Sequence, residues 1–334
     1  MPRRITAGLA ATLLIFSLML SGCSSGDSGT LVIYSGRTKD LIGPLVEQFK
    51  AETGIEIEVR YGDSAEMAGI LLLEGKASPA DVFLAQDPAS LGLVALNGMF
   101  TELPGTITDQ VPRRFSDPAG GWVGISGRAR TVAINPTTLD APLPNGIWDL
   151  TKPEYAGIGI APANGSFLAF VATMILTEGE DRTLEWLEAI AANSPSDFPK
   201  NSPIVAAVDS GEISIGLVNH YYLLRLGAER GSAVAQNHFL SAGDAGSLVM
   251  PSGAGVLATS SRRSDAEAFI EFMLSGTAQT HFAEMTFEYP LVPGVAPDAR
   301  LVPLDQIPTP DIDLSELAQV LDRATQLVTE AGLI

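Results

Sequence analysis

The chain has one cysteine, Cys23, among its 334 residues. A single cysteine excludes any disulfide within the chain, so its stability has to come from a hydrophobic core. Its amino-terminal apolar stretch, Ala7 to Leu20, is 14 residues long. That is shorter than the roughly 20 residues that a membrane-spanning helix needs. The stretch therefore predicts a segment other than a transmembrane anchor.

Catalytic signatures are also missing. The three histidines, His220, His238 and His281, have no metal-site spacing. The sequence contains no P-loop, no HExxH and no GxSxG, and the glycines of Gly157-Ile158-Gly159 lack the rest of a dinucleotide-binding loop. With no second cysteine available as a nucleophile either, we do not expect an enzyme.

Basic residues are scarce: 20 Lys and Arg stand against 39 Asp and Glu. Without Arg3 and Arg4 the balance is 18 against 39, a net charge of −21. Such a surface repels phosphate backbones, so nucleic acid is not an expected partner. The acidic surface favours solubility, and around a cation site it would also attract cations.

The amino terminus reads as a lipoprotein signal. Arg3 and Arg4 precede the apolar stretch, and Leu20-Ser21-Gly22-Cys23 closes it. We predict a signal peptide over residues 1–22, lipidation of Cys23 and a flexible tether over residues 23–29. The alternative is an ordinary spacer cysteine within a cleaved signal. On the first reading the protein lies outside the cytoplasm, anchored to the cell membrane.

Strands and helices alternate after the tether, which predicts an α/β fold with a mostly parallel sheet covered on both faces. About 312 residues remain after cleavage, enough for two lobes. In the first part we expect strands at Leu31–Tyr34, Ile55–Val59 and Asp81–Leu84, with helices from a Thr38 cap to Gly54 and from a Ser64 cap to Gly75. Further on we expect helices at Asp181–Asn193, from a Ser202 cap to Gly211, at Ser264–Leu274 and at Leu314–Gly332.

The run Asn219-His220-Tyr221-Tyr222 follows a predicted buried strand, Glu212–Val218. Adjacent tyrosines at a strand end could supply phenolates to a hard metal ion. A phenol titrates near pH 10 in water, but a trivalent cation at contact distance lowers that pKa greatly. The alternative is that a tyrosine packs in the core with its hydroxyl hydrogen-bonded.

Several short segments resemble the periplasmic ferric-ion-binding proteins, the substrate-binding components of iron ABC transporters within extracellular solute-binding protein family 1. The resemblance covers nearly all of the chain after the signal, and it rests on the order and spacing of the segments. They are Val32-Ile33-Tyr34-Ser35-Gly36-Arg37, Ser78-Pro79-Ala80-Asp81-Val82-Phe83, Ser126-Gly127-Arg128-Ala129-Arg130, Lys200-Asn201-Ser202, Gly211-Glu212-Ile213, Asn219-His220-Tyr221-Tyr222, Ser252-Gly253-Ala254-Gly255-Val256-Leu257 and Glu288-Tyr289-Pro290.

The resemblance implies a type II periplasmic binding protein fold: two α/β lobes with mixed sheets joined by crossover hinge strands. We expect the first lobe over residues 30–129 plus 248–300 and the second over residues 130–247 plus 301–334. It also implies a monomer that binds Fe(III) through Tyr221 and Tyr222 together with a synergistic anion, carbonate or phosphate. The closed form would then deliver the iron to a membrane ABC permease.

The chain departs from this family at three positions. Many members have histidine where Thr38 stands and glutamate where Gln86 stands, and some use a tyrosine near Trp148. We expect Thr38 to cap a helix, and tryptophan cannot coordinate a metal. Gln86 stays in the predicted ligand set as a neutral and weak donor. His220 should point away from the tyrosines if strand geometry continues through it.

The sequence offers more candidate groups for binding an anion than for binding a metal. The predicted cations are Arg37, Arg128 and Arg130, although each alone could be an ordinary salt bridge. The predicted polar contacts are Asn164, Gly165 and Ser166 at the start of an apolar helix, together with Asn219. Two other functions therefore stay open: binding of an organic anion, such as a phosphonate or carboxylate, without metal, and solute sensing for a signalling partner.

Overall fold

The computed structural model describes residues 29–334, so the predicted signal peptide and the Cys23 lipidation site lie outside the described residues. The strands are β1 Leu31–Ser35, β2 Ile57–Tyr61, β3 Val82–Ala85, β4 Val123–Ile134, β5 Gly159–Ile160, β6 Ser196–Asp197, β7 Ile215–Asn219, β8 Gln236–His238, β9 Val249–Val256 and β10 Tyr289–Pro290. The α-helices are α1 Lys39–Thr53, α2 Ser64–Glu74, α3 Pro88–Leu96, α4 Gly105–Thr108, α5 Gly165–Glu178, α6 Glu180–Ala192, α7 Asn201–Ser210, α8 Tyr221–Arg230, α9 Arg263–Met273, α10 Gly276–Met285 and α11 Leu317–Glu330.

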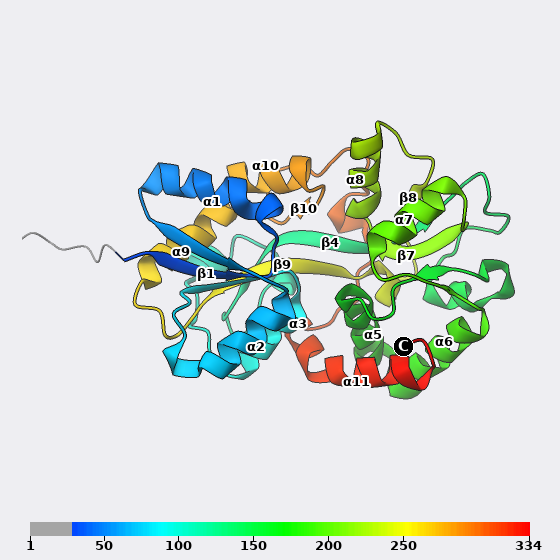
Figure 1. Ribbon diagram of the computed structural model, residues 1–334, viewed down its shortest axis with the longest axis horizontal. Helices are drawn as coiled ribbons and strands as arrows, with labels where there is room; N and C mark the ends of the chain where they lie inside the picture. Colours follow the sequence, from blue (N-terminus) through cyan, green and yellow to red (C-terminus); the bar gives the residue numbers. More distant parts are fainter. Residues whose placement is uncertain (1–28) are drawn as a thin grey trace, which may run out of the picture.

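The strands form one mixed sheet in the order β2-β1-β3-β9-β4-β7-β5-β6, with β8 and β10 also paired to β4. The long buried strand β4 joins the two halves of the molecule (Figure 1). Its pairing changes in the middle: Ala129 lies opposite Val249 of β9, and the next residue, Arg130, lies opposite Asn219 of β7. Two lobes joined by antiparallel crossover strands are therefore confirmed, whereas the residue ranges of the lobes stay a prediction.

Helix α1 shows why the sequence periodicity was informative. Its buried residues, Ile42, Leu45, Val46 and Phe49, lie at three- and four-residue spacings and pack on the core. The helix ends at Gly54, which has φ of 73° and donates its N–H to the Lys50 carbonyl at 2.9 Å. Positive φ favours glycine, so this helix end was predictable. Thr38 occupies the N-cap position, but its side chain makes no capping hydrogen bond.

Two other predicted caps are wrong by one or two residues. Asp63, not Ser64, is the N-cap of α2, because the Ser64 hydroxyl accepts a hydrogen bond from the Gln86 N–H at 2.8 Å. Likewise α7 begins at Asn201 with Lys200 at the N-cap, ahead of the predicted Ser202. In both cases a tertiary contact near the cleft decides the boundary. The Asn201 side chain donates hydrogen bonds to Asn164 and Ser166.

The C-terminal helix α11 packs against α3 of the first lobe and against α5 and α6 of the second (Figure 1). Gly92 makes the close approach to the first lobe possible: a Cβ there would lie 2.6 Å from the Ser315 carbonyl oxygen. The inward residues of α11, Leu317, Ala324, Leu327 and Val328, are buried. Within residues 29–334 no helix has the length and apolar character of a membrane span.

Candidate functional site

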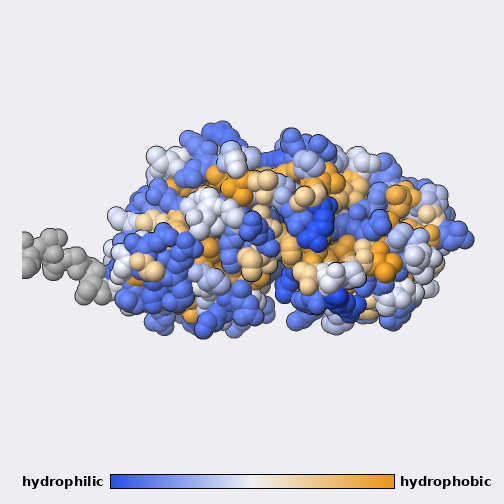
Figure 2. All heavy atoms as spheres, turned by 90° about the horizontal axis from the view of Figure 1, so that it is seen from above, coloured by the Kyte–Doolittle hydropathy of each residue, from blue (hydrophilic) through white to orange (hydrophobic). Residues whose placement is uncertain are grey.

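A cavity of about 440 Å³ lies between the lobes, where Figure 2 shows the molecule hollowed midway along its length. The first-lobe wall consists of Gly36, Asp63, Ser64, Ala65, Gln86 and Asp87. The second-lobe wall consists of Ala163, Asn164, Gly165, Ser166, Pro199, Lys200, Asn219 and Tyr222. Arg128 of β4 and Met250 of β9 complete the lining from the crossover strands. Because both lobes and both crossover strands contribute, a ligand here would bridge the lobes.

The tyrosine pair opens helix α8 and does not continue a strand. The predicted strand is shifted, because β7 covers Ile215–Asn219 and α8 starts at Tyr221. The rings of Tyr221 and Tyr222 stack with centroids 4.3 Å apart and an interplanar angle of 29°. Tyr222 is half-buried and lines the cavity, whereas Tyr221 is 6% exposed and lies behind it.

Burial controls the protonation of Tyr221. Desolvation raises the pKa of the Tyr221 phenol well above its usual value, and the neighbouring Tyr222 raises it further, while Arg128 opposes the rise. Without a metal the Tyr221 phenol is therefore protonated at neutral pH. A bound trivalent cation would have to displace this proton, which makes metal uptake depend on pH.

Arg130 is 1% exposed and lies within electrostatic range of both tyrosines. Burial lowers the pKa of its guanidinium to about 9, although the two tyrosines oppose this effect, so it stays charged at neutral pH. It donates hydrogen bonds to Asn219 Oδ1 at 3.1 Å and to Ser166 Oγ at 3.5 Å. Arg130 is absent from the cavity lining, so it acts on the site by its charge and by holding these two polar side chains.

The turn that we predict to bind an anion lies at the start of α5. Asn164 caps the helix: its Oδ1 accepts hydrogen bonds from the Ser166 N–H at 3.1 Å and from the Ser166 hydroxyl at 2.6 Å. Asn201 of α7 donates to the same oxygen at 3.2 Å. Asn164, Gly165, Ser166 and Asn219 thus share one wall of the cavity, with the positive end of a 14-residue helix facing it.

The three predicted arginines have different positions. Arg128 lines the cavity and donates to the Gln86 carbonyl, and its Nε has no hydrogen-bond partner among the described residues. Arg37 does not line the cavity. Instead its Nη2 donates to Glu288 Oε1 at 2.8 Å, with both side chains almost fully buried. The predicted direct contact of Arg37 with the anion is thus replaced in the structure by a buried ion pair.

Glu288 offsets part of this positive charge. Burial alone would raise the pKa of its carboxyl, but Arg37, Arg128 and the Ser126 hydroxyl together lower it below its usual value. The Ser126 hydroxyl donates to Glu288 Oε2 at 2.5 Å. Two buried arginines, Arg37 and Arg128, therefore share one buried carboxylate, and the excess positive charge lies next to the cavity, which Arg128 lines.

His220 is fully buried, and both of its ring nitrogens have partners. The Ala129 N–H donates to Nδ1 at 3.1 Å, so the proton is on Nε2, which donates to the Phe287 carbonyl at 2.7 Å. Burial lowers the pKa of this imidazole to about 4, and the nearby carbonyl oxygens of Phe287 and Ala129 only partly oppose it. His220 lies away from the cavity because the chain turns into α8, not because strand alternation continues.

Of the positions where the family pattern is broken, Thr38 is exposed and does not line the cavity, whereas Gln86 does. The Trp148 indole N–H donates a hydrogen bond to Glu178 at 2.9 Å, so its polar partner lies outside the tyrosine pair. Sequence reasoning missed Asp63, Asp87 and Lys200, all of which line the cavity. The Asp87-Pro88 pair is a recognisable helix start and could have drawn attention to Asp87.

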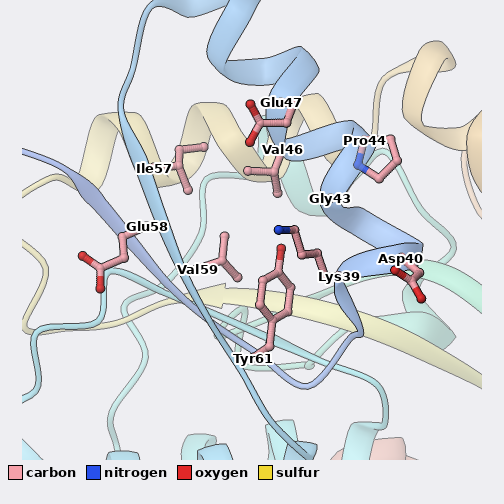
Figure 3. Close-up of a pocket in the computed structure, with 10 residues that line it drawn as sticks. All are labelled: Lys39, Asp40, Gly43, Pro44, Val46, Glu47, Ile57, Glu58, Val59 and Tyr61. Atoms are coloured by element: carbon pink, nitrogen blue, oxygen red, sulfur yellow. The ribbon is translucent and has the colours of Figure 1, made fainter.

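A larger cavity of about 680 Å³ lies between α1 and the edge strand β2, within the first lobe (Figure 3). Val46, Ile57 and Val59 form its apolar side. The carboxylates of Asp40 and Glu58 point away from each other in Figure 3, so they do not converge on one ligand position. Its size alone therefore does not make it the better candidate, and the interlobe cavity is the one with convergent polar groups.

The chain has clear similarities to known proteins. The sequence pattern of the family described as "Bacterial extracellular solute-binding protein" matches residues 77–312. The "Fe(3+)-binding periplasmic protein" of Serratia marcescens is 34% identical over the full length of both chains. The "Major ferric iron-binding protein" of Neisseria meningitidis is 28% identical, over 91% of this chain and 93% of that protein. The structure is similar to that of iron-bound HitA from Pseudomonas aeruginosa, with a TM-score of 0.84, 31% identity and coverage of 91% of this chain and 99% of HitA.

Proposed function

Because the chain belongs to the bacterial extracellular solute-binding proteins, we propose that it captures Fe(III) with a synergistic anion and delivers it to a membrane ABC permease. The stacked pair of Tyr221 and Tyr222, with Tyr222 facing the interlobe cavity, is the observation that carries this proposal. Phenolate oxygens are hard donors that suit a trivalent cation. The proposal further places the protein outside the cytoplasm, as a monomer anchored through Cys23.

The anion is part of the proposal because the protein donors alone are too few. A small oxyanion such as carbonate or phosphate would receive a hydrogen bond from the α5 N-terminus at Gly165, and would lie near Arg128. The same anion would fill coordination positions on the iron that Gln86 cannot fill well. Iron and anion would thus stabilise the closed arrangement together.

The test is a visible absorption titration of the purified protein with Fe(III) citrate, with and without carbonate or phosphate. We expect a tyrosinate-to-iron charge-transfer band that saturates near one equivalent and is absent from Tyr221→Phe and Tyr222→Phe. Iron binding by both variants at the level of the parent would contradict the phenolate assignment.

A second candidate, binding of an organic anion without metal, is favoured by one observation. Both Arg128 and Lys200 line the cavity, while the family's usual metal-binding histidine and glutamate are replaced by Thr38 and Gln86. Thermal stabilisation by a phosphonate or carboxylate, with no charge-transfer band on addition of Fe(III), would support this candidate over iron capture.

A further inference from the structure

The first-lobe wall has no strong iron donor at the positions where the family provides them, yet it contains two carboxylates. Asp63 and Asp87 both line the interlobe cavity. Asp63 precedes α2 and Asp87 precedes α3, so each is at the N-cap of a helix whose amino end faces the cavity. Because the two share residue type and helix position, their hydrogen bonds show which of them is available to a ligand.

Both carboxylate oxygens of Asp87 already accept hydrogen bonds from its own helix. Its Oδ1 accepts a hydrogen bond from the Ser90 N–H at 2.8 Å, and its Oδ2 accepts one from the Ser90 hydroxyl at 3.1 Å. This is the usual capping role of aspartate. Asp63 differs, because its side chain makes no capping hydrogen bond although its backbone has the extended N-cap conformation. No hydrogen bond or ion pair of the Asp63 carboxylate is found within residues 29–334, and the residue is exposed.

The backbone that presents Asp63 is fixed by its neighbours. Ser64 accepts a hydrogen bond from the Gln86 N–H, and Arg128 donates to the Gln86 carbonyl. Gly36 packs so closely that a Cβ there would come within 2.0 Å of Ser64 Oγ. Ser64, the residue next to Asp63, is thus hydrogen-bonded to the segment after β3 and packed against the turn after β1. Gln86 also connects it to the crossover strand β4 through Arg128. A fixed backbone with an uncommitted carboxylate is what a metal ligand requires.

The charges also fit a trivalent cation. Two phenolates and one carboxylate carry three negative charges, which equal the charge of Fe(III). Arg128, 1% exposed and with an unpartnered Nε, lies in the same cavity and leaves room for a bound anion beside the metal.

We propose that Asp63 is the ligand that the first lobe supplies to Fe(III), in place of a donor at Thr38 or Gln86. This proposal rests on the proposed function, and it names the residue through which the iron connects the two lobes. Coordination by Asp63 on one wall and by Tyr222 on the other makes lobe closure depend on the metal itself and not only on the anion.

The test compares Asp63→Asn with the matched control Asp87→Asn, both loaded with Fe(III) in the presence of carbonate. Asparagine is as good an N-cap as aspartate, so both variants should fold, which thermal unfolding checks. For Asp63→Asn we expect a tyrosinate band that persists but shifts to longer wavelength, because the iron has lost an anionic donor. We also expect loss of iron at a citrate concentration at least about tenfold lower than for the parent. Asp87→Asn should match the parent in both measurements.

The possible failures are distinguishable. A parent band that Asp63→Asn leaves unchanged in wavelength and citrate resistance overturns this assignment alone, as does a shift found only in Asp87→Asn. If Asp63→Asn weakens binding without moving the band, and Lys200→Gln does the same, Asp63 acts in an ion pair across the cavity and is not a ligand. A parent without any tyrosinate band overturns the proposed function, and this ligand with it.

Discussion

The two walls of the interlobe cavity are built differently. The second-lobe wall has its polar groups already ordered, because Asn164, Ser166 and Asn201 hydrogen-bond one another and Arg130 holds Asn219. On the first-lobe wall the hydrogen bonds fix the backbone, as at Gln86, while the Asp63 side chain is left uncommitted. We infer that the second lobe is ready to bind first and that the first lobe closes onto the bound ligand.

The largest expected effect comes from the buried charges behind the first-lobe wall. Glu288→Gln leaves Arg37 and Arg128 without their buried carboxylate, and breaking such a pair costs about 3–5 kcal/mol in the free energy of unfolding. Urea unfolding of the metal-free protein measures it. Arg323→Gln, which breaks two exposed ion pairs, is the control and should leave the urea midpoint almost unchanged. Equal losses in both variants would show that the Arg37–Glu288 pair is not special.

Tyr222→Phe should come next, because it removes a donor from the second-lobe wall while leaving its shape intact. We expect the Fe(III) affinity, measured by citrate competition, to fall by at least about 100-fold. Tyr61→Phe is the matched control, since Tyr61 lines the other cavity, between α1 and β2. A comparable loss in Tyr61→Phe would point to an indirect effect.

Acid should weaken iron binding through the same wall. Burial raises the pKa of Tyr221, so at neutral pH its phenol is protonated and iron binding must release the proton. With both phenols deprotonated on binding, the affinity should fall about 100-fold for each pH unit of acidification below neutral. Proton release measured in weakly buffered solution checks the stoichiometry. Release of one proton, with a fall of about tenfold per pH unit, would show that only one phenol is a ligand, and no release with a flat pH dependence would show that neither is.

Lys200→Gln should have the smallest effect. Lys200 is exposed at the N-cap of α7, and exposed charges contribute little in water. We expect the affinity for the synergistic anion to fall about twofold to fivefold and the loss to disappear at high salt, as seen by calorimetry. A larger loss that persists at high salt would show that Lys200 contacts the anion directly. The second-lobe wall would then provide both the charge and the hydrogen-bonding groups that bind the anion.

The sequence predicted the fold well because local patterns decide it. The apolar spacing in α1 and the positive φ of Gly54 are properties of short segments, and the parallel pairing of β1 with β2 and β3 follows from alternating strands and helices. The mostly parallel sheet that this alternation predicted is wrong at the centre, where β9 and β4 pair antiparallel with their neighbours. The second-lobe wall was also predictable, since Asn164, Ser166, Asn219 and Tyr222 all lie at strand or helix ends. Their assignment to iron and anion stays a prediction.

The first-lobe wall was poorly predicted because its side chains have alternative partners. Arg37 has the same local sequence whether it meets an anion or Glu288, and 251 positions separate the two residues. Asp63 and Asp87 both precede a helix, and the hydrogen bonds of Asp87 with Ser90 show which of the two carboxylates already has a partner. Partner choice over such separations depends on tertiary packing, which periodicity does not encode.

The position of α11 has a mechanical consequence for closure. The lobes are connected by β4, by β9 and by a C-terminal helix that packs on α3 and α5 at once. The two adjacent crossover strands alone would let the lobes both twist and bend relative to each other. Because α11 forms a third connection at a distance from these strands, we expect it to restrict the motion to one rotation. The amino ends of α3 and α5 both open at the cavity, so α11 lies against the two helices whose tips meet the ligand. We therefore expect closure to be a hinge rotation about a single axis.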